Sequence, residues 1–294
     1  MKAMSVECTI CRQPAVPNGT KKGHALHKCT QCGHLFFWPL SEDTISIYTG
    51  DYFQGAKEGF GYQDYDADKE VMTSTFFHYL DLIQKQHPPQ GPLLDVGAAT
   101  GFFLNLARQR DWQLAGVEPS DTAAAIGRAK QLDVRTGTLD QELSLEAESF
   151  AVITMWDVIE HLRDPHHVLQ NVSGLLKTGG ILAINTPDAS SILSRVLGAN
   201  WHLVIPYEHL NLFSRQSLAI ALRAHGFEPI QVTRIGKKFT LSYVMSTLAH
   251  WQGIHLWQKI ADWAKQQSWN AAGIPINLFD NVFVLARKKS ADKR

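Results

Sequence analysis

Strand and helix patterns alternate from about residue 91 to residue 290, and this alternation is what most constrains the fold. Short apolar runs indicate buried strands, and the stretches between them space apolar residues three or four positions apart, as helices do. The strand patterns occupy residues 92–97, 113–119, 133–137, 150–157, 180–187, 228–235 and 281–288. Strands alternating with helices predict an α/β fold with a doubly wound, seven-stranded sheet that binds ligands at the carboxyl ends of its strands.

A loop of small residues follows the first of these strands, in the segment LLDVGAATGFF. Asp95 ends the strand, and the turn from Gly97 to Gly101 leads directly into a helix. Small residues let a ligand approach the backbone, and the first turn of a helix favours an anionic group. Glu118 ends the next strand, where an acidic side chain can accept hydrogen bonds from ribose hydroxyls. Together the two segments predict a nucleotide-type cofactor.

The order of these motifs, D-x-G-x-x-x-G and then Glu118-Pro119, resembles that of the class I S-adenosylmethionine (SAM)-dependent methyltransferases over residues 91–287. The loop has neither the G-x-G-x-x-G of dinucleotide sites nor the Gly-Lys-Ser/Thr of Walker loops. The resemblance implies a Rossmann-like methyltransferase domain at 91–290 with SAM as cofactor. Ala99 departs from the family, since many members have glycine there. The implied cofactor-binding residues are Asp95, Gly97, Ala98, Gly101, Glu118, Pro119, Leu139, Trp156 and Asp157.

Three polar residues lie at and just after the end of the fourth predicted strand, in MWDVIEHLRDP. Asp157, Glu160 and His161 recur at i, i+3 and i+4, which a helical turn would place on one face. They could form a polar network, supply a general base for an acceptor hydroxyl, or bind a divalent metal such as Zn, Mn or Mg. The pattern resembles the E-x-x-E-H found around a metal in ubiquinone-pathway O-methyltransferases and in a bacterial RNA 3′-end methyltransferase family, with Asp157 replacing the first Glu.

His209, in PYEHLNLFS after the fifth predicted strand, is a second candidate base. Residues at this place border the acceptor pocket in the class I fold. The candidate catalytic residues are therefore His161, His209 and Asp157, and the choice between the two histidines stays open.

All four cysteines of the chain lie near the N-terminus, as two Cys-x-x-Cys pairs separated by residues 12–28. This spacing is typical of a zinc ribbon, in which two tight turns hold one tetrahedral ion. A redox motif would need a thioredoxin-like context, which these pairs lack. The sequence predicts a zinc ribbon at 1–40 with structural Zn²⁺ on Cys8, Cys11, Cys29 and Cys32.

Two segments are expected to cover the site. Residues 41–90 form a linker and a helical cap, with a helix at 68–86 and aromatic residues that close over the cofactor (Tyr48, Tyr52, Phe53 and Tyr62). Residues 241–275 form a helical lid whose apolar spacing suits core or subunit packing, an acceptor cover or membrane contact. A homo-oligomer through this helix is one expectation.

The charge and the apolar content of the chain limit which partners and compartments are expected. The formal net charge is +0 with a pI near 7.2, so the chain as a whole gives no reason to bind nucleic acid. No apolar run reaches membrane-spanning length, and the N-terminus lacks a secretory pattern, so we expect a cytoplasmic protein. Clustered cysteines in a reducing compartment favour metal over disulfides.

The acceptor is predicted to be a small molecule. The cysteine pairs followed by LFFWPL and IYTGDYF resemble the N-terminal metal region of bacterial deoxysugar C-methyltransferases and related natural-product or glycan enzymes. One alternative is a zinc-ribbon RNA methyltransferase, to which Arg12, Lys21, Lys22 and Lys28 give a modest local charge. Others are a metal-assisted O-methyltransferase and a cofactor-binding scaffold without activity. The methylated atom (O, N or C) stays open.

Overall fold

The core of the computed structural model is a seven-stranded sheet in the order β11-β14-β9-β8-β5-β6-β7. The structure describes residues 6–40, 65–139, 143–267, 269–270 and 273–290. Strands β5 to β9 are parallel, and β14 runs antiparallel to both β9 and β11. The predicted doubly wound, seven-stranded sheet is confirmed. Its strands are β5 (Pro92–Val96), β6 (Gln113–Glu118), β7 (Val134–Thr136), β8 (Phe150–Trp156), β9 (Leu176–Pro187), β11 (Phe227–Thr233) and β14 (Asn281–Lys288).

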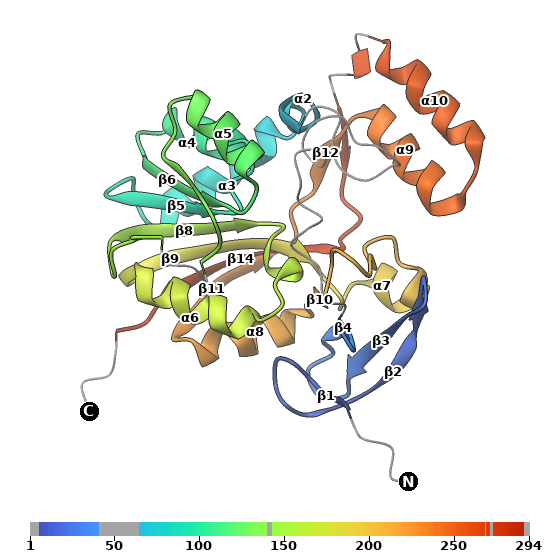
Figure 1. The fold of residues 1–294 in the computed structure, drawn as a ribbon, viewed down its shortest axis with the longest axis horizontal. Helices are drawn as coiled ribbons and strands as arrows, with labels where there is room; N and C mark the ends of the chain where they lie inside the picture. The colour runs from blue at the N-terminus through green and yellow to red at the C-terminus, as the bar shows by residue number, and fades with distance from the viewer. Residues whose placement is uncertain (1–5, 41–64, 140–142, 268, 271–272, 291–294) are drawn as a thin grey trace.

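Helices cover both faces of this sheet (Figure 1). On one face lie α3 (Thr73–Gln86), α4 (Phe102–Arg108) and α5 (Asp121–Ala129), and on the other lie α6 (Pro165–Leu175) and α8 (Arg215–Ala224). Because neither face meets water, the central strands are mostly apolar, and Val152, Ile153 and Leu182 are fully buried. Each such side chain contributes about 1.5–3 kcal/mol of burial free energy.

Local chemistry sets where the helices begin. Ser120 caps α5, because its side chain accepts a hydrogen bond from the Ala123 N–H. A reciprocal pair of hydrogen bonds between Ser214 and Ser217 starts α8. The helix predicted at 68–86 is interrupted: α2 (Tyr65–Glu70) ends before a turn, and α3 begins after it.

The N-terminal residues form a second sheet that borrows one strand from the main domain. Its strands are β1 (Val6–Glu7), β2 (Pro14–Lys21), β3 (His24–Cys29), β4 (Leu35–Phe37) and β10 (Asn211–Leu212). The first four strands and their turns, residues 6–40, are called the cysteine module below. In the β4–β10 ladder Asn211 pairs with Phe36 and Leu212 with Leu35. The apolar core of the module is continuous with the sheet face under α6 and α8, since Phe36 and Phe213 belong to one buried cluster.

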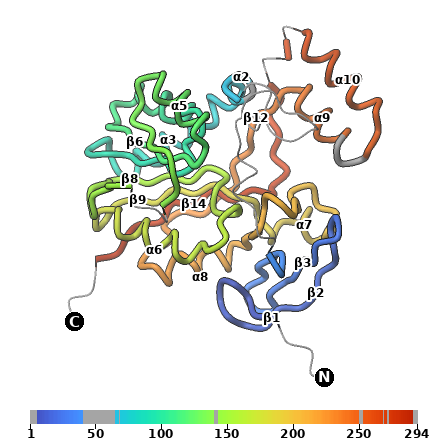
Figure 2. Tube along the Cα trace, viewed as in Figure 1, coloured from blue at the N-terminus to red at the C-terminus, as the bar shows by residue number. Residues whose placement is uncertain are grey.

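The tube view shows the module beside a short segment that follows β9 (Figure 2). This segment contains α7 (Ile192–Leu197) and a single 3-10 turn, η3 (Gly198–Asn200). Ala199 closely approaches Gly19 of β2, where an added Cβ would lie only 3.2 Å from the Ala199 Cβ. The module therefore contacts the main domain at β10 and also at the α7–η3 segment.

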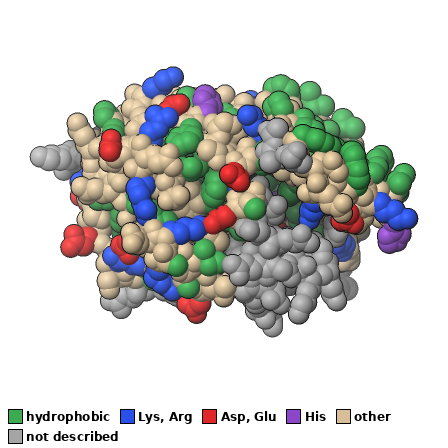
Figure 3. All heavy atoms as spheres, turned by 90° about the horizontal axis from the view of Figure 1, so that it is seen from above, with side chains coloured by type: hydrophobic (Ala, Val, Ile, Leu, Met, Phe, Trp, Pro, Cys, Tyr) green, Lys and Arg blue, Asp and Glu red, His purple; other side chains and the backbone are tan. Residues whose placement is uncertain are grey.

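The predicted lid at 241–275 is two helices rather than one. α9 (Leu241–Gln252) ends at Gly253, whose left-handed φ of 69° stops the helix, and α10 (His255–Lys265) packs back on α9. Both helices lie in the chain between β12 (Lys237–Phe239) and β13 (Ile274–Ile276), which pair as a two-stranded antiparallel sheet. Large apolar side chains of α10, such as Leu256 and Trp263, are exposed. Figure 3 shows apolar side chains gathered at the end of the molecule that carries α9 and α10.

Figure 1 places the cysteine module and the α9–α10 pair on either side of the carboxyl edge of the sheet. None of the helices that the structure describes is long and apolar enough to cross a membrane. The aromatic linker residues Tyr48, Tyr52, Phe53 and Tyr62 lie outside the described residues, so their closure over the cofactor stays a prediction.

Candidate functional site

The glycine loop after β5 is held in a conformation that only small residues tolerate. Gly97, Ala99 and Gly101 have φ values of 75°, 48° and 77°. An added Cβ at Gly97 would lie 2.6 Å from Val158 Cγ2, and one at Gly101 would lie 2.5 Å from Leu132 Cδ1. Glycine is therefore required at both positions, and Ala99 bears the cost of a left-handed backbone with a side chain.

Two buried carboxylates flank this loop. Glu118, 3% exposed, accepts hydrogen bonds from the N–H groups of Ala99 and Ser120, each at 2.9 Å. Asp95, 2% exposed, accepts one from Thr154 Oγ1 at 2.6 Å. Burial raises the pKa of Glu118 to about 7 and that of Asp95 to about 8, although these hydrogen bonds oppose the shift. The oxygens of Glu118 keep further lone pairs that ribose hydroxyls can use.

The remaining predicted cofactor residues differ in their surroundings. Ala98 is buried in the loop, and Pro119 directly follows Glu118. Leu139 is buried, and its carbonyl accepts a hydrogen bond from Asn171. The Trp156 ring packs against Tyr79 at a centroid distance of 4.9 Å, and its buried indole N–H has no partner among the described residues. The structure thus brings the loop and Glu118 together, whereas Trp156 joins an aromatic cluster.

Asp157 is held by a lysine that the sequence gave no reason to consider. Lys237 Nζ, on β12, lies 2.7 and 2.8 Å from the two carboxylate oxygens of Asp157, and Asn185 Nδ2 donates to it at 2.7 Å. Burial raises the pKa of Asp157, but the charges of Lys237 and Lys69 and these hydrogen bonds outweigh it, so the pKa is lowered. Asp157 therefore remains a carboxylate paired with Lys237.

The expected helical face of Asp157, Glu160 and His161 does not form. Asp157 has a left-handed φ of 55°, and the helical turn, η2 (Ile159–His161), starts only after it. Glu160 and His161 instead converge with His209, and one potential ligand atom from each lies within 4.8 Å of the others. These three residues are called the triad below.

Backbone carbonyls fix the orientation of both triad histidines. His161 Nδ1 donates to the carbonyl of Glu208 at 2.7 Å, and His209 Nδ1 donates to that of Leu203 at 2.7 Å. Because a carbonyl can only accept, Nδ1 of each neutral ring carries the proton, and a further backbone hydrogen bond to Asp157 also holds His161. The two rings meet edge to face with centroids 4.9 Å apart.

Glu160 completes the triad with a carboxylate that is not fully satisfied. It is 0% exposed, and its Oε2 accepts a hydrogen bond from Thr186 Oγ1 at 2.8 Å. Its Oε1 is buried and has no hydrogen-bond partner among the described residues. Burial raises the pKa of Glu160 to about 7 and lowers the pKa of His161 and of His209 to about 4. Two neutral imidazoles and one carboxylate suit a divalent transition metal. Each of the three groups is also oriented by a hydrogen bond to a neighbouring protein group.

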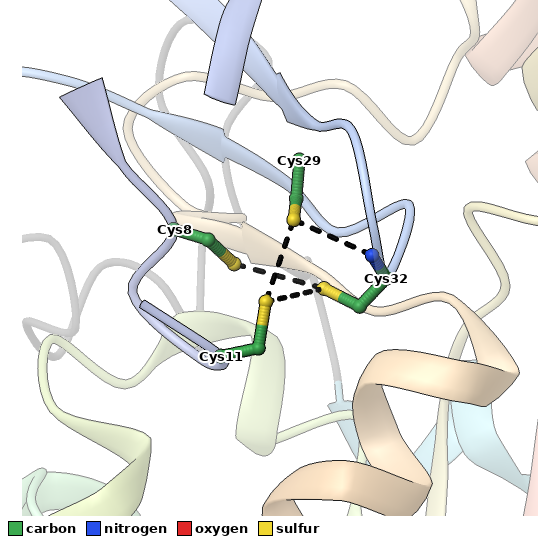
Figure 4. A group of neighbouring side chains, drawn as sticks. All are labelled: Cys8, Cys11, Cys29 and Cys32. Atoms are coloured by element: carbon green, nitrogen blue, oxygen red, sulfur yellow. Dashed lines mark hydrogen bonds between the residues drawn. The ribbon is translucent and has the colours of Figure 1, made fainter. Parts of the chain in front are cut away.

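The four cysteines converge as predicted (Figure 4). The sulfur of Cys11 lies 3.4 Å from the sulfurs of Cys29 and Cys32, and the sulfurs of Cys8 and Cys32 are 3.7 Å apart. Tetrahedral Zn–S bonds of about 2.3 Å place sulfurs about 3.8 Å apart, so the spacing fits zinc. All four are free thiols rather than disulfides.

The two Cys-x-x-Cys turns have matching backbones. The residue after each pair, Arg12 or Gly33, has a positive φ of 61° or 70°. A backbone N–H donates to the first sulfur of each pair, at 3.4 Å in both turns. Such turns aim two thiolates at one point, which is what the sequence spacing predicted.

The side chains that attach the cysteine module were missed in the sequence. His34 is 0% exposed, and its Nε2 lies 3.1 Å from Asn211 Oδ1. On α6, His166 has Nε2 3.0 Å from the carbonyl of Ile10. Asn211 lies between two leucines, and a polar residue in such a place indicates a buried hydrogen bond. The sequence does not show which residue is the partner of Asn211.

The strand order, the glycine loop after β5 and the acid that ends β6 define a Rossmann-like methyltransferase fold. Residues 70–232 match the family model of a methyltransferase domain, which is more than half of the chain. The chain therefore belongs to the methyltransferase family and contains a class I SAM-dependent methyltransferase domain, as the motif order indicated.

Known relatives agree with this assignment. The chain is 27% identical over 166 residues to a ubiquinone biosynthesis O-methyltransferase of Ralstonia nicotianae, covering 52% of this chain and 70% of that enzyme. It is 26% identical over 144 residues to the C-methyltransferase NovU of Streptomyces niveus, covering 48% of this chain but only 33% of NovU. A solved SAM-dependent methyltransferase of Thermotoga maritima has a TM-score of 0.51 and 24% identity, over 76% of this chain and 94% of that one. This last likeness concerns the fold.

Proposed function

We propose that the protein transfers a methyl group from SAM to a hydroxyl of a small-molecule acceptor, a sugar, glycan or natural-product precursor, with a divalent cation held by the triad. The observation that carries the proposal is the buried convergence of Glu160, His161 and His209. Glu160 follows β8 and His209 precedes β10, so the triad joins two loops at the carboxyl edge of the sheet, where such folds bind ligands.

The cofactor would be held by the glycine loop and its two carboxylates. Asp95, Gly97, Ala98 and Gly101 would lie along it, and Glu118 would accept hydrogen bonds from the ribose hydroxyls. SAM supplies an electrophilic methyl group whose leaving group is a neutral thioether, so no acid is needed. The protein then contributes mainly positioning and the exclusion of water.

The histidines of the triad suit a role as ligands better than one as general bases. A base works best when its pKa is near the operating pH, but burial lowers the pKa of His161 and of His209 to about 4. The same shift keeps both rings neutral at pH 7, which is the form that binds metals. A divalent cation held there would favour the deprotonated form of an acceptor hydroxyl. Asp157, paired with Lys237, would border this site as a fixed negative charge.

The acceptor class follows from the relatives and the triad together. The two relatives named above are an O-methyltransferase and a C-methyltransferase, and neither name refers to RNA or protein. Between oxygen and carbon, the triad favours oxygen, because a cation lowers the pKa of a hydroxyl directly. We further propose that Cys8, Cys11, Cys29 and Cys32 hold a structural Zn²⁺ that keeps the cysteine module folded.

The test uses the full chain with methyl-labelled SAM and a panel of sugar nucleotides, phenolic precursors and RNA. With Mn²⁺ or Mg²⁺ added, we expect label on a hydroxyl of a small acceptor and loss of turnover after chelation. Glu160→Gln should lower turnover about 100-fold while the affinity for S-adenosylhomocysteine stays near normal. The control is His255→Ala, which alters an exposed histidine of α10. Label on RNA only, or turnover indifferent to Glu160→Gln, would contradict the proposal.

A further inference from the structure

We propose that Asn211 is a positioning residue that couples the cysteine module to the triad. The coupling rests on hydrogen bonds between described residues and does not itself require a metal at the triad. One of its two readouts, Mn²⁺ binding, rests on the proposed function.

The side chain of Asn211 makes one hydrogen bond to the backbone next to the triad and two hydrogen bonds to side chains of the cysteine module. Its Nδ2 donates to the carbonyl of Leu162 at 2.6 Å, and Leu162 is the residue directly after His161. Its Oδ1 lies 3.1 Å from His34 Nε2 and 3.4 Å from Thr9 Oγ1. Because Asn211 is only 3% exposed, water cannot readily replace these partners. The same amide therefore fixes the backbone beside His161 and binds the turns that carry the cysteines.

The second triad histidine is fixed from the same side. His209 lies two positions before Asn211, and the Phe37 N–H donates to the carbonyl of Leu210, between them, at 3.2 Å. The β4–β10 ladder continues this contact through the pair of Phe36 and Asn211. The cysteine module thus contacts chain next to both histidines, although it supplies no triad ligand itself.

The other attachments of the module make this contact rigid. Ser214 Oγ donates to the carbonyl of Cys32 at 2.5 Å, and this serine also caps α8. Cys32 is 1% exposed and belongs to the same apolar cluster as Phe213 and Leu218. A change at the cysteines would therefore move β4 and β10 together, and Asn211 is the side chain that passes this movement to the His161 loop.

The test is the variant Asn211→Leu, which keeps a similar volume and removes all three side-chain hydrogen bonds. Three quantities are measured on the full chain: zinc content, the tautomer of each triad imidazole by histidine ¹⁵N NMR, and the affinity for Mn²⁺. Wild-type protein should show both rings protonated at Nδ1. In the variant, zinc content should stay at the wild-type level, the His161 signal should lose its single-tautomer position, and Mn²⁺ affinity should fall about 10- to 100-fold. Thr30→Val is the matched control, since Thr30 lies in the cysteine module and its exposed hydroxyl donates to the carbonyl of Pro14, away from Asn211.

Zinc removal offers a second measurement if Asn211→Leu folds poorly. Chelation of zinc from the wild type should shift the His161 and His209 signals in the same direction as the substitution. Unchanged imidazole signals, in the zinc-loaded variant or in the zinc-free wild type, would overturn the coupling. If the wild type binds no Mn²⁺ at all, the metal proposal fails, but the NMR comparison still decides whether Asn211 positions His161.

Discussion

The cysteine cluster and the triad are both candidate metal sites, but they are built in opposite ways. The cysteines come from two short turns, each with its ligands three positions apart and a positive φ directly after the pair. The triad joins the loop after β8 to the loop before β10, and each of its imidazoles is oriented by a backbone carbonyl. A site encoded within a turn can be found in a sequence, whereas a site assembled between loops depends on the tertiary fold.

The largest effect should come from Cys29→Ser. A structural zinc contributes about 10–16 kcal/mol of binding free energy in small peptides, so losing one of four thiolates should cost several kcal/mol of stability. We expect loss of zinc, a lower Tm and weaker Mn²⁺ binding at the triad, measured by metal analysis, thermal unfolding and titration. Thr30→Val should leave all three unchanged. Wild-type zinc content in Cys29→Ser would remove the distinction between the two sites.

A substitution in the triad, His209→Ala, should lower stability less than Cys29→Ser and should weaken metal binding at the triad alone. The triad is expected to lose at least about 100-fold in Mn²⁺ affinity, because one of three ligands is gone. Zinc content should stay at the wild-type level, since no cysteine contact is altered. Loss of zinc in this variant would mean that a change in the triad also alters the cysteine cluster. His255→Ala serves as the exposed control.

The glycine loop differs from both candidate metal sites, because its affinity for the cofactor should depend on pH through Glu118. The pKa of Glu118 is raised by burial from 4.5 to about 7, so without cofactor this carboxyl contributes stability below pH 4.5 and loses it as the pH rises through about 7. An ionised Glu118 accepts hydrogen bonds more strongly, so the affinity for S-adenosylhomocysteine should rise about tenfold between pH 6 and pH 8. Glu118→Gln should flatten this rise in a calorimetric titration. An equally steep rise in the variant would place the titrating group elsewhere, with Asp95 as the first alternative.

The smallest effect should come from Ala99→Gly. Ala99 has a φ of 48°, a conformation that glycine adopts without steric cost, so the substitution should raise stability by about 0.5–1 kcal/mol. Denaturant unfolding would measure this change. Ala98→Gly is the matched control, because Ala98 has no positive φ and should be destabilised instead. A destabilised Ala99→Gly would show that the methyl group makes packing contacts worth more than the strain.

The sequence was sufficient wherever a pattern and its consequence lie close together in the chain. The seven strands, the glycine turn and the convergence of the cysteines all follow from local spacing. It was insufficient where the partner is distant. Nothing near Asp157 indicates Lys237, and a two-residue strand such as β10 carries no periodicity that could reveal its pairing with β4.

One error has a clear physical origin. Asp157 was placed on a helical face with Glu160 and His161, but the helical turn starts only after it. Helix ends are decided by single hydrogen bonds and single φ angles, which periodicity does not resolve. The triad was therefore predicted with two of its three members together and with His209 considered separately.

Anomalous diffraction from crystals of the full chain soaked in Mn²⁺, recorded at the manganese and zinc edges, tests the two-site account most directly. We predict a zinc peak among the sulfurs of the four cysteines and a separate manganese peak bordered by Glu160, His161 and His209. A triad that stays free of manganese at millimolar concentration, with Glu160 Oε1 bonded to a neighbouring protein group instead, would contradict the account.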